Sequence, residues 1–449
     1  MGLAVLPDER VLHTTRDGDV WLHDGAGGKT LAAHLPVYTH DEEGLQGIAL
    51  DPAFATNGWV YLYYSPPLAT PPDDPASATD EGPAPEAGSP ESWAPFAGYL
   101  QLSRFRFDGS ALDLASEQRI LEVPVERGIC CHIGGQIDFD AAGNLLLSTG
   151  DDTNPFASNG FTPIDERAER NPAFDAQRSA ANTNDLRGKL LRIHVQDDGS
   201  YTIPDNNLFA PGTAQTRPEI YVMGLRNPFR FSVDRERGTV YVADYSPDAP
   251  SPLAARGPAG TGKWAIVRGA GNYGWPYCAT AELAYVDYDF ATATSGEPFD
   301  CSAPSNRSPR NTGLIELPPV TQPEVFYSYG ASERFAALGG GGIGPMAGPV
   351  HVFDPENPSP RQWPSDLSGS PVFYEWTRDF IALFRLTPDG SSLDRIEVLS
   401  GQVRVDNPID MEFGPDGALY ILNYGDGYHS ANPDASLVRV DALPVTASD

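Results

Sequence analysis

A short hairpin pattern recurs along the whole chain and constrains the fold more than any other feature. The pattern is an apolar strand, a turn with Asp or Pro and Gly, and a second strand rich in Val, Leu and Tyr. Such hairpins are typical of the inner strands of propeller blades. We therefore predict an all-β fold, a six-bladed β-propeller, from copies over residues 4–22, 47–64, 137–147, 231–242, 372–383 and 411–422.

The segments between the hairpins divide into outer strands and long insertions. Residues 100–107, 189–194 and 436–440 are expected to be outer strands. We predict a single propeller domain over residues 1–449, with insertions at about 66–97, 153–185 and 277–320 on the face that carries the site. The first insertion is of low complexity and predicts a mobile surface loop without function of its own. The second predicts an ordered cap, and residues 339–349 are expected to form a glycine-rich loop.

The charge and hydropathy of the chain exclude two classes of partner. The 449 residues carry a net charge of −31, which would repel nucleic acid. No apolar run reaches the length of a membrane span. No signal peptide is recognisable at the start of the chain. The acidic, lysine-poor composition fits a secreted or periplasmic protein whose leader is absent from this sequence. A compositional bias of the genome would give the same acidic surface.

The four cysteines give the second indication of compartment. Cys278 and Cys301 flank an irregular loop, and we predict that they pair as a disulfide in an oxidising compartment. Cys130 and Cys131 are adjacent, and are either free or joined as a vicinal disulfide. A zinc site is not expected, because no Cys-x-x-Cys set accompanies them.

Polar residues at the ends of several hairpins predict a site. His132 follows the two cysteines in a glycine-rich stretch, and Asp151 lies 19 residues later, across a hairpin. A histidine beside a carboxylate can serve as a general base, although a hydrogen-bonded turn histidine would have the same sequence. Because loops from successive blades converge over the channel, we expect one site there. Its members are Glu42, His132, Asp151, Arg226, Asn227 and Tyr273.

Six stretches in order resemble the glucose/sorbosone dehydrogenase family, six-bladed propellers related to soluble quinoprotein aldose dehydrogenases. The resemblance covers roughly residues 1–441 and is greatest to a branch found beside ThuA-like or PKD-type modules in secreted bacterial proteins. Attachment to such modules in the native protein is therefore a further expectation. The stretches are Glu42–Phe54, Cys131–Gly135, Gly150–Asp151, Leu186–Ile193, Gly224–Phe229 and Gly271–Pro276.

The resemblance implies a reaction and a set of roles. It implies a dehydrogenase that oxidises an aldose sugar at C1, passing hydride to C5 of pyrroloquinoline quinone (PQQ) and electrons on to an acceptor. His132 would be the proton acceptor, Asp151 its orienting carboxylate, and Arg226 with Asn227 the contacts to the quinone oxygens. Ca²⁺ would bind backbone carbonyls of Ser246 and Pro247. The resemblance also places Glu42, Tyr273 and Arg378 against the cofactor.

Three departures from the family pattern keep two alternatives open. Glu42 and Cys131 stand where soluble glucose dehydrogenases have glutamine and an acidic residue, and their quinone-binding lysine has no clear match among the three lysines here. The first alternative is a non-redox carbohydrate-binding propeller. The second is a calcium-assisted acid/base enzyme that degrades polysaccharides.

Overall fold

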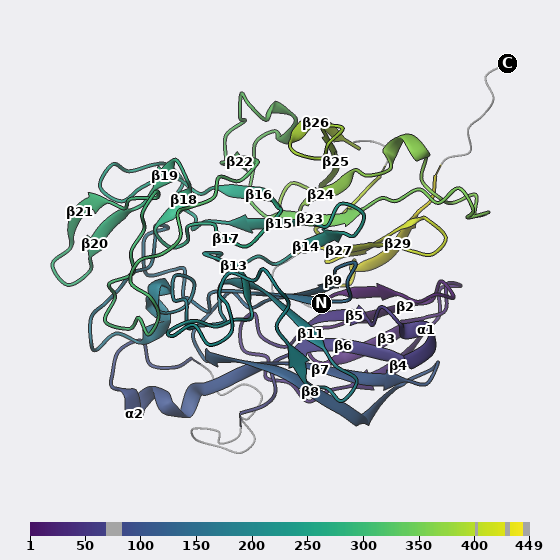
Figure 1. Ribbon diagram of the computed structural model, residues 1–449, viewed down its shortest axis with the longest axis horizontal. Helices are drawn as coiled ribbons and strands as arrows, with labels where there is room; N and C mark the ends of the chain where they lie inside the picture. The colour runs from purple at the N-terminus through teal and green to yellow at the C-terminus, as the bar shows by residue number, and fades with distance from the viewer. Residues whose placement is uncertain (69–82, 400–402, 427–431, 443–449) are drawn as a thin grey trace.

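The computed structural model describes residues 1–68, 83–399, 403–426 and 432–442, which form a six-bladed β-propeller (Figure 1). The predicted fold is therefore confirmed. The first three blades consist of β1 (Leu3–Val5), β2 (Val11–Thr14), β3 (Asp19–His23) and β4 (Lys29–His34); β5 (Leu45–Leu50), β6 (Trp59–Tyr64), β7 (Ala97–Phe107) and β8 (Leu112–Glu126); and β9 (Gly134–Phe139), β10 (Leu145–Thr149), β11 (Lys189–Val195) and β13 (Ile220–Met223).

The other three blades complete the circle. They consist of β14 (Phe231–Asp234), β15 (Thr239–Tyr245), β16 (Gly262–Val267) and β22 (Val325–Tyr327); β23 (Pro345–Val350), β24 (Pro371–Glu375), β25 (Phe380–Leu386) and β26 (Leu393–Val398); and β27 (Pro408–Phe413), β28 (Leu419–Asn423) and β29 (Ser436–Val440). The predicted outer strands 100–107, 189–194 and 436–440 correspond to β7, β11 and β29.

Short elements lie outside the blade pattern. The strands are β12 (Tyr201–Thr202), which pairs with β11, and β17 (Gly271–Asn272), which pairs with β13. Two further hairpins are β18 (Cys278–Thr280) with β19 (Leu283–Ala284), and β20 (Val286–Asp289) with β21 (Thr294–Pro298). The helices are α1 (Phe54–Asn57), α2 (Pro90–Trp93), η2 (Ala94–Phe96), η3 (Pro172–Phe174), η4 (Ala176–Arg178), η5 (Ala336–Leu338) and η6 (Ser365–Leu367).

The innermost strands form a closed ring around the central channel. In order, β1, β5, β9, β14, β23 and β27 each contact the next, and β27 contacts β1. The first and last blades therefore meet, with the purple first blade beside the yellow last blade in Figure 1. Hydrophobic clusters fill the space between successive blades, as expected for sheets buried on both faces.

Carboxylates close this ring through hydrogen bonds between blades. Asp410 and Glu412 on β27 accept the backbone N–H groups of Leu3 and Val5 on β1, at 2.8 and 2.9 Å. Asp138 on β9 accepts the N–H of Val233 on β14 at 2.9 Å. An inner strand is the edge of its own sheet, so these N–H groups would otherwise lack a partner.

The repeat is encoded by its turn. In the third blade, the Asp140 carboxylate accepts the N–H groups of Ala142 and Asn144, both at 2.9 Å. Gly143 follows with φ = +76°, a conformation that a residue without a Cβ adopts at little cost. The Asp and Gly of the sequence pattern therefore reverse the chain between β9 and β10.

Two expectations about the fifth blade are corrected. The hairpin over 372–383 exists, but it is formed by β24 and β25, the second and third strands of the blade. The inner strand is β23, so Pro345–Pro349 belong to a strand and not to the predicted loop. Proline is tolerated there because β23 begins at Pro345 and is a sheet edge, and its register shifts between Ala347 and Val350.

The first insertion is also more ordered than expected over the part that the structure describes. Ala84 and Phe96 pack in one buried cluster with Ile129 and Phe174. Ala84 N–H donates to Gly128 O at 2.7 Å, just before the two cysteines. Residues 83–97 are therefore not a loose surface loop, whereas the prediction for 69–82 lies outside the described residues.

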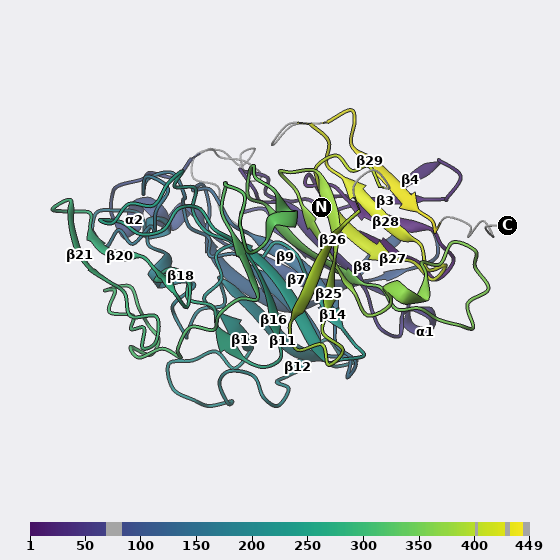
Figure 2. The ribbon, with the colours of Figure 1, turned by 90° about the horizontal axis from the view of Figure 1, so that it is seen from above.

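The third insertion extends to one side of the propeller, as the β18–β21 region shows in Figures 1 and 2. Its predicted disulfide is confirmed, with Cys278 and Cys301 joined by an S–S bond of 1.97 Å. Cys130 and Cys131, left open by the sequence, form a vicinal disulfide across a cis peptide bond. No helix in the described part of the chain is long and apolar enough to cross a membrane.

The closing carboxylates generate a prediction about pH and stability. Burial raises the pKa of Glu412 from its ordinary value of 4.5 to about 8, and the neighbouring Asp410 and Asp138 charges act in the same direction. The protonated form therefore favours the folded state, so this stability is complete below pH 4.5 and is lost as pH rises through 8. The side chain in Glu412→Gln stays neutral at every pH. At pH 9 the free energy of unfolding of this variant should exceed that of the parent by on the order of 2 kcal/mol, with little difference at pH 4.5.

Urea unfolding at pH 4.5, 7 and 9 measures this difference. Glu316→Gln is the control, because the side chain of Glu316 is 73% exposed. If the difference in free energy of unfolding between Glu412→Gln and the parent does not grow with pH, the raised pKa of Glu412 is contradicted.

Candidate functional site

The central channel holds a separate cavity at each end. One, of about 220 Å³, lies at the N-terminal ends of the inner strands and is lined by residues that include Glu42, Asn227, Tyr245 and Trp376. The other, of about 530 Å³, lies along their C-terminal halves. Arg230 lines the larger cavity and donates to the carbonyls of Phe229 and Ile409, which line the smaller one, at 2.9 and 2.8 Å. We call the 220 Å³ space the channel-mouth cavity.

The structure brings His132 and Asp151 together next to this cavity, which is lined by the adjacent Ile133 but not by His132 or Asp151 themselves. His132 precedes β9 and Asp151 follows β10, so the pairing of these two strands places the side chains opposite each other. His132 Nδ1 lies 2.7 Å from Asp151 Oδ1, and the residues are 3% and 0% exposed. A Cβ on Gly150 would overlap the carbonyl oxygen of His132, so glycine is needed for this approach.

Glu42 extends this arrangement from the second blade. The Glu42 carboxylate accepts the backbone N–H of His132 at 2.6 Å, where His132 has φ = +73°. Glu42 also lines the channel-mouth cavity. The predicted neighbours Glu42, His132 and Asp151 are therefore adjacent in space.

Arg226 and Asn227 join the same group from the loop before β14. The Asp244 carboxylate accepts both of their backbone N–H groups, at 3.1 and 2.8 Å, and pairs with Lys263 at 3.4 Å. Arg226 O accepts the N–H of Asp151 at 2.8 Å. Asn227 Oδ1 accepts the N–H of Gly134 at 3.0 Å. These bonds tie the fourth blade to the strand ends that hold His132 and Asp151.

The Arg226 guanidinium is a buried cation, and two of its nitrogens make no hydrogen bond within the described residues. The residue is 2% exposed, and its Nε and Nη1 find no hydrogen-bond acceptor among the described residues. Burial acts to lower its pKa, but Tyr245 and the carboxylates of Asp151 and Asp248 outweigh burial and raise the pKa. The group therefore stays charged and suits a ligand that presents oxygen atoms with negative charge.

Tyr245 adds a neutral hydroxyl to the cavity wall. Burial raises its pKa to about 12, the Glu42 charge adds to this shift, and Arg226 opposes it. Its hydroxyl lies 3.3 Å from the Asn227 side-chain nitrogen, and its ring lies 5.0 Å from the Arg226 guanidinium carbon. Tyr245 therefore offers a hydrogen bond without a charge at neutral pH.

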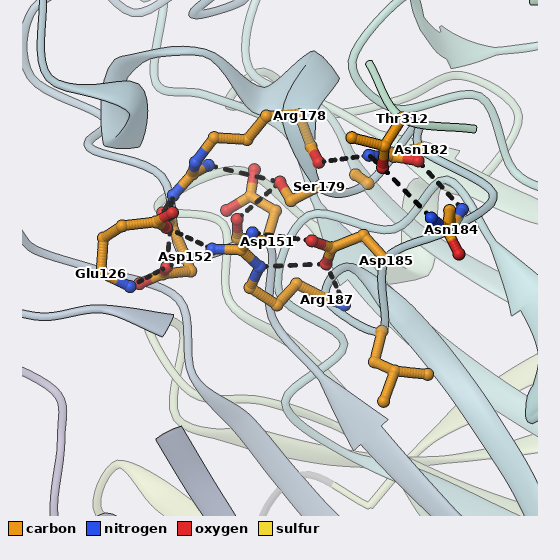
Figure 3. Close-up of polar contacts among 12 residues, drawn as sticks. Glu126, Asp151, Asp152, Arg178, Ser179, Asn182, Asn184, Asp185, Arg187 and Thr312 are labelled. Carbon is orange, nitrogen blue, oxygen red and sulfur yellow. Dashed lines mark hydrogen bonds and ion pairs between the residues drawn. The ribbon is translucent and has the colours of Figure 1, made fainter. Parts of the chain in front are cut away.

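A buried network of charges supports Asp151 from the other side (Figure 3). Arg178 and Arg187 both contact the Asp152 carboxylate, at 3.2 and 2.8 Å, and both pair with Glu126. Arg187 also binds Asp185 at 2.7 Å. Burial raises the pKa of Asp152, and the Glu126 charge raises it further against the two arginines.

Residues of this network and its neighbour Ser179 also bind the backbone carbonyls of Asp151 and Asp152. Arg178 donates to the Asp152 carbonyl at 2.6 Å, and the Ser179 hydroxyl donates to the Asp151 carbonyl at 2.7 Å. Asp152 has φ = +54°, an uncommon conformation that such contacts hold in place. The second insertion, which supplies Arg178 and Ser179, therefore shapes the site.

Two predicted cofactor contacts, Tyr273 and Arg378, do not line the channel-mouth cavity. The Tyr273 ring packs in the hydrophobic cluster around β13–β15, and Tyr273 is not among the residues that line the channel-mouth cavity. Arg378 donates to the carbonyls of Gly342, Leu338 and Ser328, at 2.6, 2.9 and 3.0 Å, and does not line it either. The predicted cofactor contacts of these two residues stay predictions.

Ser246 and Pro247 follow β15, immediately after Tyr245. The Ser246 hydroxyl accepts the N–H of Thr261 at 2.7 Å and lies 3.2 Å from the Pro247 carbonyl. Both residues are buried, and the following residue, Asp248, is exposed. The charge of Asp248 acts on the pKa of Arg226, and the calcium ligation predicted for Ser246 and Pro247 stays a prediction.

Sequence reasoning did not assign a role to several residues that complete the site. Trp275 donates its indole N–H to Asp151 Oδ2 at 2.6 Å. It belongs to the Gly271–Pro276 stretch, whose aromatic and proline residues were a usable signal of a fixed turn. Arg187 belongs to the Leu186–Ile193 stretch, but neither it nor Arg178 gave a signal of this role, because a buried ion pair between distant segments leaves no spacing pattern.

The fold and the site together define a class of protein. It is a six-bladed propeller whose channel mouth carries a buried histidine–aspartate pair next to a buried arginine. The family model for glucose/sorbosone dehydrogenase matches residues 1–305. The chain therefore belongs to the glucose/sorbosone dehydrogenase family.

Individual relatives show the same relationship at low identity. The chain is 33% identical over 155 residues to the HIPL2 protein of Arabidopsis thaliana, covering 32% of this chain and 18% of that protein. It is 26% identical over 279 residues to the aldose sugar dehydrogenase YliI of Escherichia coli, covering 61% of this chain and 58% of the relative. The matches thus span less than two thirds of these relatives.

A solved structure agrees with the fold. The PQQ-bound aldose sugar dehydrogenase from Streptomyces coelicolor is 16% identical, with a TM-score of 0.55 over 98% of this chain and 93% of that one. At this identity the match supports the propeller architecture and not the chemistry.

The buried charge network generates a prediction. Arg187→Met removes one of the two cations beside Asp152 and Glu126, and we expect it to lower the free energy of unfolding by about 3 kcal/mol at pH 8. The loss should be smaller at pH 5, because the carboxyls that lose their partner can then take up a proton. The measurement is urea unfolding at both pH values.

The control is Arg307→Met. Arg307 pairs with Glu316 at 3.3 Å, but the two side chains are 70% and 73% exposed, so its loss should cost below about 1 kcal/mol. Equal effects of the two substitutions would show that the buried network does not hold the strand end.

Proposed function

We propose that this protein is a PQQ- and calcium-dependent sugar dehydrogenase that oxidises an aldose at C1. The observation that carries the proposal is the buried His132–Asp151 pair beside Arg226, whose guanidinium keeps donors without an acceptor among the described residues. A base and a fixed positive charge are what removal of a hydride and a proton from an alcohol requires. Membership of the family supports the same conclusion.

The residues at the channel mouth fit a quinone with several carboxylates. Arg226 and Asn227 would supply donors to quinone oxygens, and Arg16, which lines the cavity together with Asn227, adds a cation there. Tyr245, Trp376 and Phe229 give the cavity aromatic surface for a planar ring system. PQQ, when bound, supplies a two-electron acceptor for the hydride of the sugar. Glu42, Tyr273 and Arg378 remain predicted cofactor contacts.

The calcium part of the proposal depends on the loop after β15. Carbonyl oxygens of Ser246 and Pro247 are hard donors of the kind Ca²⁺ prefers. Asp248 adds a negative charge close enough to raise the pKa of Arg226 and Tyr245. The loop thus favours a cation next to the site.

His132 would act as the general base. With its Nδ1 held by Asp151, its Nε2 can take the proton of the C1 hydroxyl as hydride leaves the carbon. Asp151 would hold the ring in place and stabilise the imidazolium that forms. Arg226 would favour the negative charge that develops on the oxidant. Trp376 and Tyr424, whose ring centroids lie 6.2 Å apart at the cavity, offer apolar faces to a sugar.

One observation favours a second candidate. Glu42 places a carboxylate in the cavity wall, bonded to the His132 N–H, and no lysine lines this cavity. A carbohydrate-binding propeller without redox activity, or an acid/base enzyme acting on polysaccharides with calcium, would also use such a carboxylate. For either function we propose export from the cell, on the basis of the Cys278–Cys301 disulfide.

The test is reconstitution. The protein is incubated with PQQ and Ca²⁺, the absorption spectrum is recorded, and dye reduction is followed on a panel of aldoses. We expect binding at micromolar PQQ, dye reduction that needs both additions, and loss of activity on chelation of calcium. Absence of PQQ binding would reject the dehydrogenase, and sugar binding without dye reduction would favour the carbohydrate-binding module.

Variants then separate binding from catalysis. His132→Ala should lower kcat by about 10³-fold while PQQ still binds, because the base and not the cofactor contact is removed. Arg226→Met should instead weaken PQQ binding by at least about tenfold, because a charged hydrogen bond is lost. Loss of PQQ binding in His132→Ala would show that His132 holds the cofactor and is not only a base.

A further inference from the structure

Trp275 reaches the Asp151 carboxylate from a different part of the chain than His132. Its indole Nε1 lies 2.6 Å from Asp151 Oδ2, while His132 Nδ1 lies 2.7 Å from Oδ1. Oδ1 also accepts the backbone N–H of Thr153 at 3.1 Å. Trp275 is 2% exposed and Asp151 is completely buried. Both oxygens of the carboxylate are therefore occupied, each by its own set of donors.

The nature of these donors decides where the proton between Asp151 and His132 lies. An indole N–H and a backbone N–H can only donate, so both contacts require acceptor oxygens and favour an ionised carboxylate. An ionised carboxylate accepts only, so Nδ1 of His132 must carry a hydrogen. Nε2 is then the basic nitrogen of the neutral ring, the one that can receive a proton.

Trp275 is itself held rigidly. The backbone N–H of Trp275 donates to Gly224 O at 3.0 Å. The backbone N–H groups of Tyr277 and Cys278 close the turn by donating to Gly274 O at 2.9 and 2.8 Å. The Cys278–Cys301 disulfide begins three residues later. The indole packs edge-on against Tyr285, with ring centroids 5.8 Å apart. The third insertion thus fixes the angle from which the indole meets Asp151.

We propose that Trp275 is a positioning residue: its indole N–H locks the Asp151 carboxylate and so selects the His132 tautomer with Nε2 free to act as a base. The proposal deepens the proposed dehydrogenase function. Only the measurement of activity rests on that function, whereas the measurement of the tautomer does not. Without the indole bond, the carboxylate can turn about its bond to Cβ and no longer fixes the hydrogen on Nδ1. His132 would then also adopt the other neutral tautomer, with its hydrogen on Nε2, which cannot act as the base.

The test compares Trp275→Phe with Trp264→Phe. Trp264 is an equally buried tryptophan, stacked on Tyr241 between blades, and its indole nitrogen has no acceptor in the described part of the chain. The two substitutions thus remove the same buried group, but only Trp275 reaches the site.

The first measurement needs no cofactor. The eight histidines are labelled with ¹⁵N, and the ring nitrogens of His132 are identified by the signals lost in His132→Gln. The parent and Trp264→Phe should show one neutral tautomer with hydrogen on Nδ1. Trp275→Phe should show a mixture of the two neutral tautomers.

The second measurement uses the protein loaded with PQQ and Ca²⁺. Trp275→Phe should lower kcat by about tenfold with little change in the KM for sugar. If the parent shows no dye reduction but the tautomer changes as expected, the dehydrogenase proposal fails and the positioning role stands. If Trp275→Phe keeps the parent's single tautomer, the positioning role is overturned.

A third measurement covers the case in which Trp275→Phe does not fold. One of the seven tryptophan indole N–H signals of the parent should lie downfield of the others, as expected for a short bond to a carboxylate, and should move upfield in Asp151→Asn. No indole signal that responds to Asp151→Asn would overturn the proposal.

Discussion

The closed ring of inner strands depends on how the backbone edges around the channel are satisfied. Each inner strand is the edge of its blade, and an unpaired N–H there would cost stability and invite pairing with another chain. Asp410, Glu412 and Asp138 solve this by accepting N–H groups of the neighbouring blade. Because β27 meets β1 through two of these bonds, the first and last blades are joined by side chains as well as by packing.

The site is built by the same kind of bond between blades. The His132 N–H meets Glu42 of the second blade, and the Gly134 N–H meets Asn227 from the loop before the fourth. The Asp151 N–H meets Arg226 O. Polar side chains and backbone groups at the channel mouth therefore cross-link three blades, and the residues of the candidate site lie at the crossing points. A shift of one blade would change the geometry of the site directly.

Buried charge at this position contributes more to geometry than to stability. Placing Arg178, Arg187, Asp152 and Glu126 together carries a desolvation cost that their attraction largely offsets. What the network provides is a single arrangement of the strand end after β10, including the left-handed Asp152. Asp151 then receives donors from both sides, from Trp275 and from His132.

Local sequence was a reliable guide wherever a single hairpin carried the information. Alternating apolar residues around an Asp/Gly turn predicted five of the inner hairpins, and the cysteine spacing predicted the disulfide of the third insertion. The inner strand β23 was missed because Pro345, Gly348 and Pro349 are poor strand formers, and only its place at a sheet edge makes them acceptable. The packing of residues 83–97 was missed because its partners, Ile129 and Phe174, are distant in sequence.

The sequence alone determined the repeat, the number of blades and the polar residues at their ends, because these follow from local turn chemistry and strand periodicity. Only the tertiary structure decided which of those residues meet. It joined His132 to Asp151 and Asp151 to Arg226, left Tyr273 in a hydrophobic cluster and directed Arg378 to the carbonyls of the glycine-rich loop. It also brought Trp275 to Asp151, a contact across 124 residues. Such contacts depend on the relative placement of blades, which no short stretch of sequence encodes.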